Sequence, residues 1–276
     1  NDVYGIYFDY TDDSRIEYSI IGSNSDMGIY FYHSDSNIVN STNITSNQDH
    51  GIYLNVAGYN NISSCNLSYN GDAASEYGIF ALGSADNNLI YNNYFNNTLN
   101  VFSDSDSNTN YWNITKDCSS GPSILGGSCL GGNYWTSPTQ DNFSDTCTDA
   151  TGDGICDSDY NIVRDEWDYE PLTRISLEAT LNFPSDNNDS VDLSSVTFSC
   201  SANGTGLQSM SLWSDYTGSW QLIETKDMTG TSNTTTFTRD VYTDMGSHIT
   251  DSEFSWNCMA YDSESNSDWA DRNYTF

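Results

Sequence analysis

The sequence predicts an all-β protein built from a parallel β-helix of about five coils and a C-terminal β-sandwich. Three observations predict this fold class: a short repeat in the first half of the chain, its end near Ile175, and short alternating segments after it. The length of 276 residues is about twice that of a typical domain. We therefore expect two domains, residues 1–173 and residues 176–276.

The tripeptides Gly-Ile-Tyr and Gly-Ile-Phe mark the repeat. They begin at Gly5, Gly28, Gly51 and Gly78, and a degenerate copy follows at Asn100. Turns of Asn, Asp, Ser and Gly, which tolerate positive φ, separate the apolar segments. Units of this period bury their apolar faces against one another. We expect two interior columns and one outward aromatic column, namely Ile6, Ile29, Ile52 and Ile79; Phe8, Phe31, Leu54 and Ala81; and Tyr7, Tyr30, Tyr53 and Phe80.

Residues 1–173 resemble a known family. A leucine-rich repeat has a similar period, but its Leu-x-x-Leu-x-Leu frame is missing. The repeat, followed by Asn110–Asn113, Gly131–Trp135 and Tyr169–Leu172, resembles the carbohydrate-binding and sugar-hydrolase (CASH) class, in particular NosD-like surface proteins of archaea. The Gly-Gly-Asn-Tyr-Trp segment is the most specific part of this resemblance. It implies a right-handed β-helix and a surface protein of archaeal type.

The second domain is expected to contain seven short strands, at Glu178–Phe183, Val196–Cys200, Met210–Trp213, Trp220–Glu224, Thr234–Thr238, Phe254–Tyr261 and Arg272–Phe276. Trp213 stands between Cys200 and Cys258, much nearer to the first cysteine than to the second. This spacing is similar to that of immunoglobulin-like (Ig-like) domains, in which a tryptophan packs on a disulfide between two sheets. Two unrelated buried thiols are the alternative. Trp256 stands where antibody domains carry a tyrosine, so the resemblance is to the general class.

The seven cysteines indicate three disulfides and one free thiol. Besides Cys200–Cys258, proximity along the chain favours Cys118–Cys129 and Cys147–Cys156 among the 15 connectivities that six cysteines allow. Cys65 is left over, and we expect a buried, inert thiol there, with pairing between molecules as the alternative. Zinc is weakly supported, because no Cys-x-x-Cys occurs and the three histidines are scattered. Disulfides indicate an oxidising compartment.

Eleven Asn-x-Ser/Thr sequons predict N-linked glycans. The Asn-rich composition raises the number of such motifs, but an outward position favours those at Asn43, Asn61 and Asn66, which directly precede inward apolar residues. The acceptors are Asn40, Asn43, Asn61, Asn66, Asn96, Asn113, Asn142, Asn188, Asn203, Asn233 and Asn273.

An acidic loop predicts a structural calcium site. Its side-chain ligands would come from Asp149, Thr151, Asp153 and Asp157, with the Ile155 carbonyl at position 7 and Gly154 at position 6, as in the first nine positions of an EF-hand loop. Tyr160 stands where an EF-hand has its bidentate Glu, so the neighbouring Asp159 is the expected replacement. The alternative is a solvated acidic turn held by the Cys147–Cys156 bridge.

Charge excludes several classes of partner. Seven Lys and Arg against 39 Asp and Glu give a net charge of −32, so binding to nucleic acid or to an anionic membrane surface is excluded. No apolar run is long enough to span a bilayer.

An enzyme is not favoured, although related folds act on carbohydrates. The acidic residues Asp26, Asp49 and Glu76 recur ahead of successive repeats, but a solvated ladder explains them. His33 and His50 lie at opposite ends of neighbouring strands, and no cluster of soft ligands for copper is present.

The function we expect is that of a secreted, N-glycosylated, Ca²⁺-stabilised structural protein of a cell surface layer or extracellular filament. The chain begins directly on the first coil, so copies are expected to stack head-to-tail through an open β-helix end. The alternatives are a surface protein that binds or cleaves carbohydrate, which would make surface glycans its partner, and an adhesin that uses residues 176–276.

Overall fold

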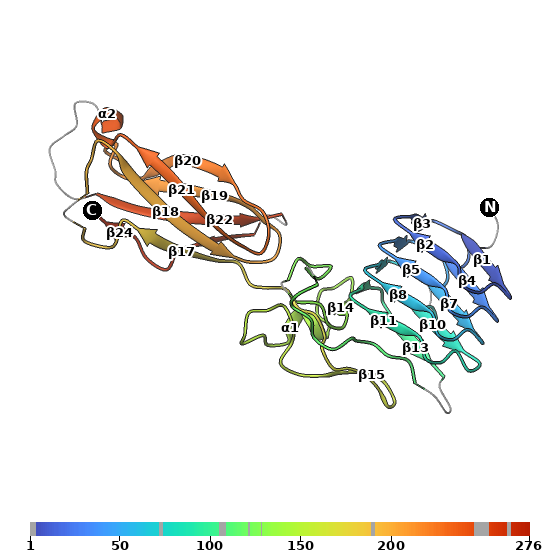
Figure 1. Cartoon of the computed structure of the whole chain (residues 1–276). Coiled ribbons are helices and arrows are strands. Elements are labelled where there is room, and N and C mark those ends of the chain that lie inside the picture. Colours follow the sequence, from blue (N-terminus) through green and yellow to red (C-terminus); the bar gives the residue numbers. More distant parts are fainter. Residues whose placement is uncertain are drawn as a thin grey trace. The chain divides into compact units, whose positions relative to one another are not determined.

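The computed structural model describes residues 4–71, 74–104, 109–120, 122–127, 129–188, 191–245, 254–263 and 266–276. The chain divides into two compact units, Asn1–Arg174 and Ile175–Phe276 (Figure 1). Strands dominate both units; the helices in the described part are α1 (Phe143–Thr146) and α2 (Val241–Met245). The predicted all-β fold class is confirmed.

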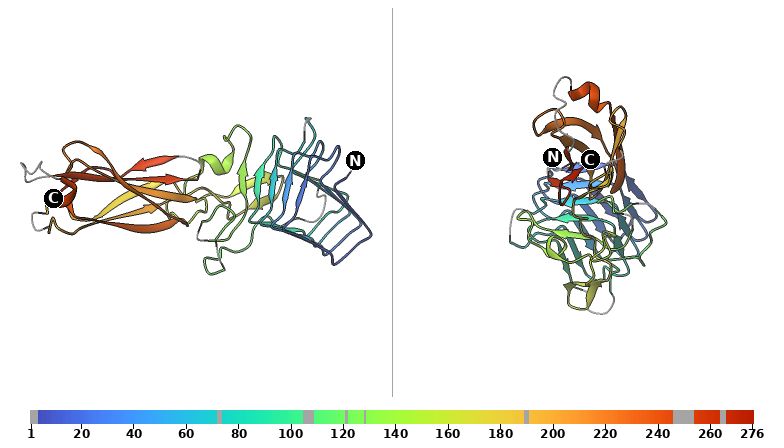
Figure 2. Two further views of the ribbon diagram at one scale, coloured as in Figure 1. Left: turned by 90° about the horizontal axis from the view of Figure 1, so that it is seen from above. Right: turned by 90° about the vertical axis from the view of Figure 1, so that its left-hand side faces the viewer.

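The first unit is a parallel β-helix, as predicted. Three sheets run along it, and every pairing within them is parallel. Figure 2 shows the coils stacked as successive rungs. The first sheet contains β1 (Ile6–Asp9), β4 (Ile29–Tyr32), β7 (Ile52–Asn55), β10 (Ile79–Leu82) and β13 (Val101–Ser103). The second contains β2 (Arg15–Glu17), β5 (Ile38–Asn40), β8 (Asn61–Ser63) and β11 (Leu89–Tyr91); the third contains β3 (Ile20–Gly22), β6 (Asn43–Thr45), β9 (Asn66–Ser68), β12 (Tyr94–Asn96) and β14 (Tyr134–Thr136).

The register of the first sheet creates the two predicted interior columns. Ile29, Ile52 and Ile79 are paired in register and fully buried, and the second column ends at the buried Ala81. The repeated glycine has a steric reason, because a Cβ on Gly28 would lie only 2.6 Å from the Gly51 carbonyl oxygen of the next coil. The short distance between coils therefore explains two features: the isoleucines stack in contact, and the residue before each isoleucine is glycine.

The last coil is closed by a segment of the same chain. Two strands, β15 (Tyr160–Val163) and β16 (Glu166–Asp168), form an antiparallel hairpin. Trp135 of the Gly-Gly-Asn-Tyr-Trp segment stacks on Phe95 at 4.5 Å, and its indole N–H donates to Asp168. Gly132 approaches that carboxylate so closely that a Cβ would overlap it. The disulfides Cys118–Cys129 and Cys147–Cys156 hold this region, with the predicted pairing.

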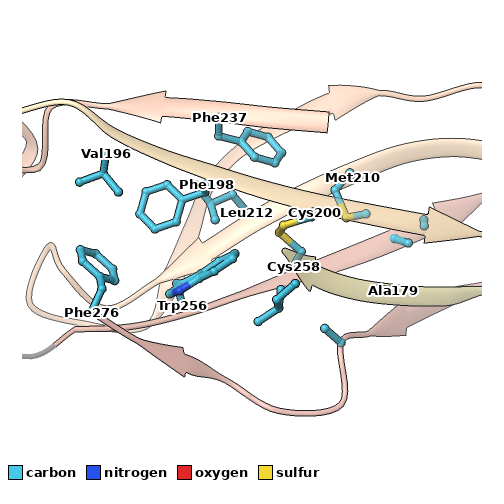
Figure 3. Packing of buried hydrophobic residues seen from close by; sticks show 14 of the residues in the cluster. Ala179, Val196, Phe198, Cys200, Met210, Leu212, Phe237, Trp256, Cys258 and Phe276 are labelled. Carbon is cyan, nitrogen blue, oxygen red and sulfur yellow. A yellow bond between two sulfur atoms is a disulfide. The ribbon is translucent and has the colours of Figure 1, made fainter. Parts of the chain in front are cut away.

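The second unit consists of antiparallel sheets packed on one apolar core (Figure 3). One sheet is formed by β17 (Glu178–Phe183), β18 (Val196–Asn203) and β21 (Ser232–Arg239). The other is formed by β20 (Gln221–Asp227), β19 (Leu207–Ser214), β22 (Ser255–Asp262), β23 (Ser267–Trp269) and β24 (Tyr274–Thr275). The Cys200–Cys258 disulfide joins β18 to β22 and so links the two sheets. Membership of the Ig-like class stays a prediction.

One detail of the predicted second domain is wrong. Trp213 does not pack on the disulfide: Leu212 lies opposite Cys258 in the strand register, so the alternation of β19 turns Trp213 to the outer face. The fully buried Trp256, two positions before Cys258, fills the core instead (Figure 3). The alternation within each strand, rather than the spacing along the chain, decides which tryptophan faces inward.

Cys65 is buried and free, as expected. It lies in register with Thr42 and Asn93 of the neighbouring coils. Its Sγ lies 3.2 Å from the Ser63 carbonyl oxygen. Burial raises the pKa of the Cys65 thiol to about 12, so the thiol stays protonated and unreactive.

Candidate functional site

The outward aromatic column on the first sheet is the most prominent surface feature of the β-helix. Tyr7, Tyr30, Tyr53 and Phe80 are paired in register, and Phe102 on β13 extends the column by one coil. Ring centroids of neighbours lie 5.1, 4.8, 5.2 and 4.9 Å apart in that order. The predicted aromatic column therefore forms.

The geometry of this column limits what it can bind. Tyr30 and Tyr53 are nearly parallel, at 6°, so their faces cover one another. A sugar ring that stacks on an aromatic side chain needs an uncovered face, and these rings present mainly edges and hydroxyl groups. One hydroxyl is also used, because the Asn55 amide donates to the Tyr30 oxygen at 2.9 Å. The column consequently stabilises the stack of coils and is a poor platform for sugar.

The acidic ladder lies at the N-terminal ends of β4 and β7, beside the column. Burial first, and then the charge of Asp49 and a hydrogen bond with it, raise the pKa of Asp26. Carboxyl groups that share a hydrogen bond are closer together than the ~5 Å that retaining glycosidases use, and much closer than the ~6.5–9.5 Å of inverting enzymes. The Asp26–Asp49 pair therefore lacks the spacing of a glycosidase site.

His50 is buried next to this ladder. Its Nδ1 accepts the Tyr77 backbone N–H at 2.9 Å, and its ring stacks on Phe80 at 4.3 Å. Burial lowers its pKa to about 4, although the charges of Glu76 and Asp26 oppose the shift. Nδ1 also lies 3.2 Å from Asp49 Oδ1, the geometry of an ion pair. Because Nδ1 already accepts a hydrogen bond and the pKa is low, His50 is neutral at pH 7 and forms no ion pair there.

Sequence reasoning missed the asparagine ladders that line the turns inside the coils. In each ladder the side-chain Nδ2 of one asparagine donates to the Oδ1 of the asparagine in the next coil, at 2.8 to 3.2 Å. The second Nδ2 hydrogen reaches a backbone carbonyl, as from Asn70 to Ile44 at 2.8 Å. The members are Asn37, Asn60, Asn88 and Asn110 in one ladder and Asn24, Asn47, Asn70, Asn97 and Asn100 in another.

The signal for one ladder was present in the sequence. Asn24, Asn47, Asn70 and Asn97 all stand at the same distance along the chain from the glycine that begins their repeat. Most of the ladder asparagines are buried. An asparagine that only forms a turn on the surface would be exposed. A strictly repeated buried amide is therefore typical of an internal hydrogen-bond ladder.

Backbone and indole N–H groups at the end of the coils reach two buried carboxylates of β16, whereas the last ladder amide, Asn110 Nδ2, has no partner among the described residues. The Trp112 indole N–H donates to Glu166 Oε2 at 2.7 Å, and the Asn110 backbone N–H points to Oε1. Asn133, which continues the column of Cys65 and Asn93, donates its backbone N–H to Asp168 Oδ2 at 2.7 Å. Burial raises the pKa of Asp168 to about 7, and hydrogen bonds from Asn133 and Trp135 oppose this shift. Glu166 and Asp168 therefore help to close the end of the β-helix by accepting hydrogen bonds from its last coil.

The predicted calcium loop, which runs from Asp149 to Asp159, makes many internal hydrogen bonds. Asp149 accepts from the Gly152 and Gly154 backbone N–H groups, both at 2.8 Å, and Asp157 accepts from Ala150 at 3.0 Å. The Thr151 hydroxyl donates to Asp153 at 2.8 Å, and the Ile155 backbone N–H donates to the same carboxylate at 3.1 Å.

A positive charge already lies at this loop, since Lys116 pairs with Asp153. Burial opposes the shift, but hydrogen bonds from Lys116 and Thr151 lower the pKa of Asp153. Among the described residues, no group of three or more His, Cys, Asp or Glu is arranged to hold a metal ion. Calcium binding by this loop stays a prediction.

The sequon asparagines differ in exposure. Asn43, Asn203 and Asn273 are exposed, whereas Asn96 is only 7% exposed. A glycan needs an accessible Nδ2, so Asn96 is the weakest of the predicted acceptors. The half-buried acceptors are Asn40, Asn61, Asn66, Asn113, Asn142, Asn188 and Asn233.

A family model described as "Periplasmic copper-binding protein (NosD)" matches residues 1–140, which contain the β-helical coils. No curated protein and no solved structure matches the chain. Within the part of the chain that the structure describes, no helix is long and apolar enough to cross a membrane.

The described residues do not fit the copper site that the family's description implies. His33 stacks on Tyr10, whereas His50 is buried against Phe80, and Cys65 is buried in the interior of the coils. Copper prefers several imidazole or sulfur ligands around one centre. The structure does not gather such ligands in the regions it describes, and His248 lies outside them.

Proposed function

We propose that this chain, which belongs to the NosD family through residues 1–140, is a structural glycoprotein that works outside the cytoplasm as part of a cell surface layer or extracellular filament. Its three disulfides require an oxidising compartment, which supports this location. The observation that carries the proposal is the use of the repeated side chains for coil-to-coil bonding, in ladders of amides and columns of rings.

The interior of the β-helix supports a structural role, because the ladder asparagines form hydrogen bonds with neighbouring coils of the same chain. Asn60 alone joins three successive coils through its side chain. The cavity lined by Thr98–Val101, Trp135 and Tyr160 has about 210 Å³, less than the ~300–1,000 Å³ typical of ligand pockets. Coils that bond to one another in this way, with an exposed sequon at Asn43, suit a surface layer.

Three finer features belong to the same proposal. N-linked glycans would occupy the exposed sequons, calcium would bind the Asp149–Asp159 loop, and copies would associate by adding coils in register. The acidic surface supports calcium, since carboxylates that repel one another are stabilised by a divalent cation.

The experiment uses the full chain secreted from a host that performs N-glycosylation. Glycopeptide mass spectrometry should find glycans at exposed sequons such as Asn43 and none at Asn96. Electron microscopy and sedimentation, with Ca²⁺ and with a chelator, should show ordered assemblies that Ca²⁺ strengthens. Unmodified, monomeric particles in both buffers would overturn the proposal.

The carbohydrate-active alternative rests on the raised pKa of Asp26 beside Asp49, while the close spacing of the two carboxyl groups counts against it. Cleavage of neutral polysaccharides by the full chain, lost in Asp49→Asn, would support it. Absence of any cleavage would leave the acids as part of the coil stack.

A further inference from the structure

The second unit has a cluster of tryptophans on the outer face of one sheet. Trp220 is 40% exposed and Trp269 39%, and Trp213 is half-buried between β20 and β22. The Trp213 and Trp269 ring centroids lie 5.5 Å apart, and those of Trp220 and Trp269 lie 6.3 Å apart. Single exposed apolar residues are common on proteins, but three indoles in contact form a patch that indicates a binding surface.

The rings of this cluster do not stack face to face. Trp213 and Trp269 meet edge to face at 63°, and Trp220 is tilted by 41° to Trp269. This arrangement differs from the aromatic column of the β-helix, where Tyr30 and Tyr53 lie parallel at 6° and cover each other. Since Trp220 and Trp269 are 40% and 39% exposed and do not stack face to face, these two indoles present aromatic surface to the solvent.

Neutral polar side chains share the same face. The strand register places Ser211 between Thr225 and Met259, and the two hydroxyls lie 2.7 Å apart. In the neighbouring row, the Asn257 amide donates to the exposed Asn273 at 2.9 Å. These hydroxyl and amide groups act as donors and as acceptors. The face thus combines large aromatic surfaces with hydrogen-bonding groups that carry no charge.

The absence of charge is unusual for this protein. The chain has 39 acidic residues, yet among the outward positions that the register assigns to β19, β20, β22 and β23 only Asp227, at the far end, is charged. A net charge of −32 repels anionic ligands. An uncharged aromatic face on such a molecule suits a neutral partner.

Trp213 adds an independent observation. Its indole N–H is buried and has no acceptor among the described residues. A buried unsatisfied donor is costly and needs an explanation. An oxygen acceptor from a bound molecule would satisfy it after a small shift of the neighbouring indoles.

We propose that the outer face around Trp213, Trp220 and Trp269 binds a neutral carbohydrate chain. The C–H faces of the sugar rings would pack on the indoles, and the sugar hydroxyls would bond to the exposed Thr225 hydroxyl and Asn273 amide beside them. This site goes beyond the structural role proposed above and does not depend on it. It would attach the protein to neutral polysaccharide of its surroundings.

The test uses the full chain, produced without glycans so that its own sugars do not occupy the site. The probes are a soluble β-glucan, a mannan and an N-acetylglucosamine hexamer, with polygalacturonate as the anionic control. Affinity electrophoresis and quenching of tryptophan fluorescence report binding. We expect at least one neutral probe to bind and polygalacturonate not to bind.

The variants identify the surface. Trp269→Ala should weaken binding at least tenfold, and Trp269→Tyr should retain part of it. Trp167→Ala is the matched control, because Trp167 is 38% exposed but lies on β16 of the first unit. Unchanged binding in Trp269→Ala, failure of every neutral probe, or loss of self-association in place of sugar binding would each overturn the proposal. Circular dichroism of each variant confirms that it is folded.

Discussion

Asn60 offers the sharpest test of the ladder as the source of β-helix stability. Its Oδ1 accepts the Asn37 backbone N–H at 2.8 Å and the Asn37 Nδ2 at 3.1 Å. Its own Nδ2 donates to Ser34 O at 3.2 Å and to Asn88 Oδ1 at 3.0 Å. The substitution Asn60→Ala therefore removes four hydrogen bonds from a side chain that is almost fully buried.

The cost follows from the groups left behind. Asn88 keeps the bond from the Asn60 backbone N–H, at 2.9 Å, so its oxygen remains partnered. Two Asn37 donors lose their acceptor inside the coil, and each unsatisfied buried group costs about 1–3 kcal/mol. We expect a loss of roughly 2–6 kcal/mol, a large fraction of the ~5–15 kcal/mol that stabilises a typical domain. At about 2–4 °C per kcal/mol for a unit of this size, the β-helix should melt at least several degrees lower.

Calorimetry of the full chain measures the loss, and hydrogen exchange of peptides that cover β5 assigns it to the first unit. Asn43→Ala, at an exposed asparagine one sheet away, is the control and should leave stability almost unchanged, as surface substitutions usually do. Asn60→Asp keeps the acceptor and loses the donor, so it should retain protection at Asn37 that Asn60→Ala loses. Equal melting of Asn60→Ala and Asn43→Ala would refute the ladder argument.

Three further outcomes are expected from the structure. Gly132→Ala should destabilise the first unit by several kcal/mol in urea unfolding, because its Cβ overlaps the buried Asp168 carboxylate, whereas Gly152→Ala, with open space around it, should cost about 1 kcal/mol from its positive φ alone. The pKa of His50 is lowered to about 4 in the folded state, so the unfolded chain binds the proton first, and stability should fall as pH drops from 6.5 through 4; His50→Gln should flatten that part of a stability-versus-pH curve. The Cys65 thiol should resist iodoacetamide at pH 8 until denaturant is added, as mass spectrometry would show, and rapid alkylation of native protein would contradict its burial.

The repeat predicted the β-helix because each coil obeys the same steric rule. Gly28 and Gly51 start their strands where the next backbone is too close for a side chain, and Ile29 and Ile52 follow inside. The alternation of a strand then sends Tyr30 outward. At these positions the local preference of each residue agrees with its place in the stack of coils. A single sequence was therefore sufficient to predict the β-helix.

Other features depend on geometry that the sequence pattern does not contain. Asparagine favours turns, and only the register shows that Asn60 is buried between coils. The distance of a tryptophan from Cys200 along the chain does not show which face of the strand it occupies. Leu212 faces the core, so Trp213, the next residue, faces outward. The acidic loop has ligand spacing, yet Lys116, far away in sequence, supplies the positive charge at Asp153.

The direction of the ladders explains why the β-helix closes on acids. Each asparagine donates toward the next coil, as from Asn37 to Asn60 and from Asn60 to Asn88, so the amide dipoles of a ladder point the same way. Their positive ends accumulate at the last coil, as they do at the N-terminus of a helix. At that end Glu166 and Asp168 accept the backbone N–H groups of Asn110 and Asn133, which an apolar side chain would leave unpaired. The β15–β16 hairpin is therefore continuous with the coils in hydrogen bonding, and its removal would expose the ladder ends as well as the apolar core.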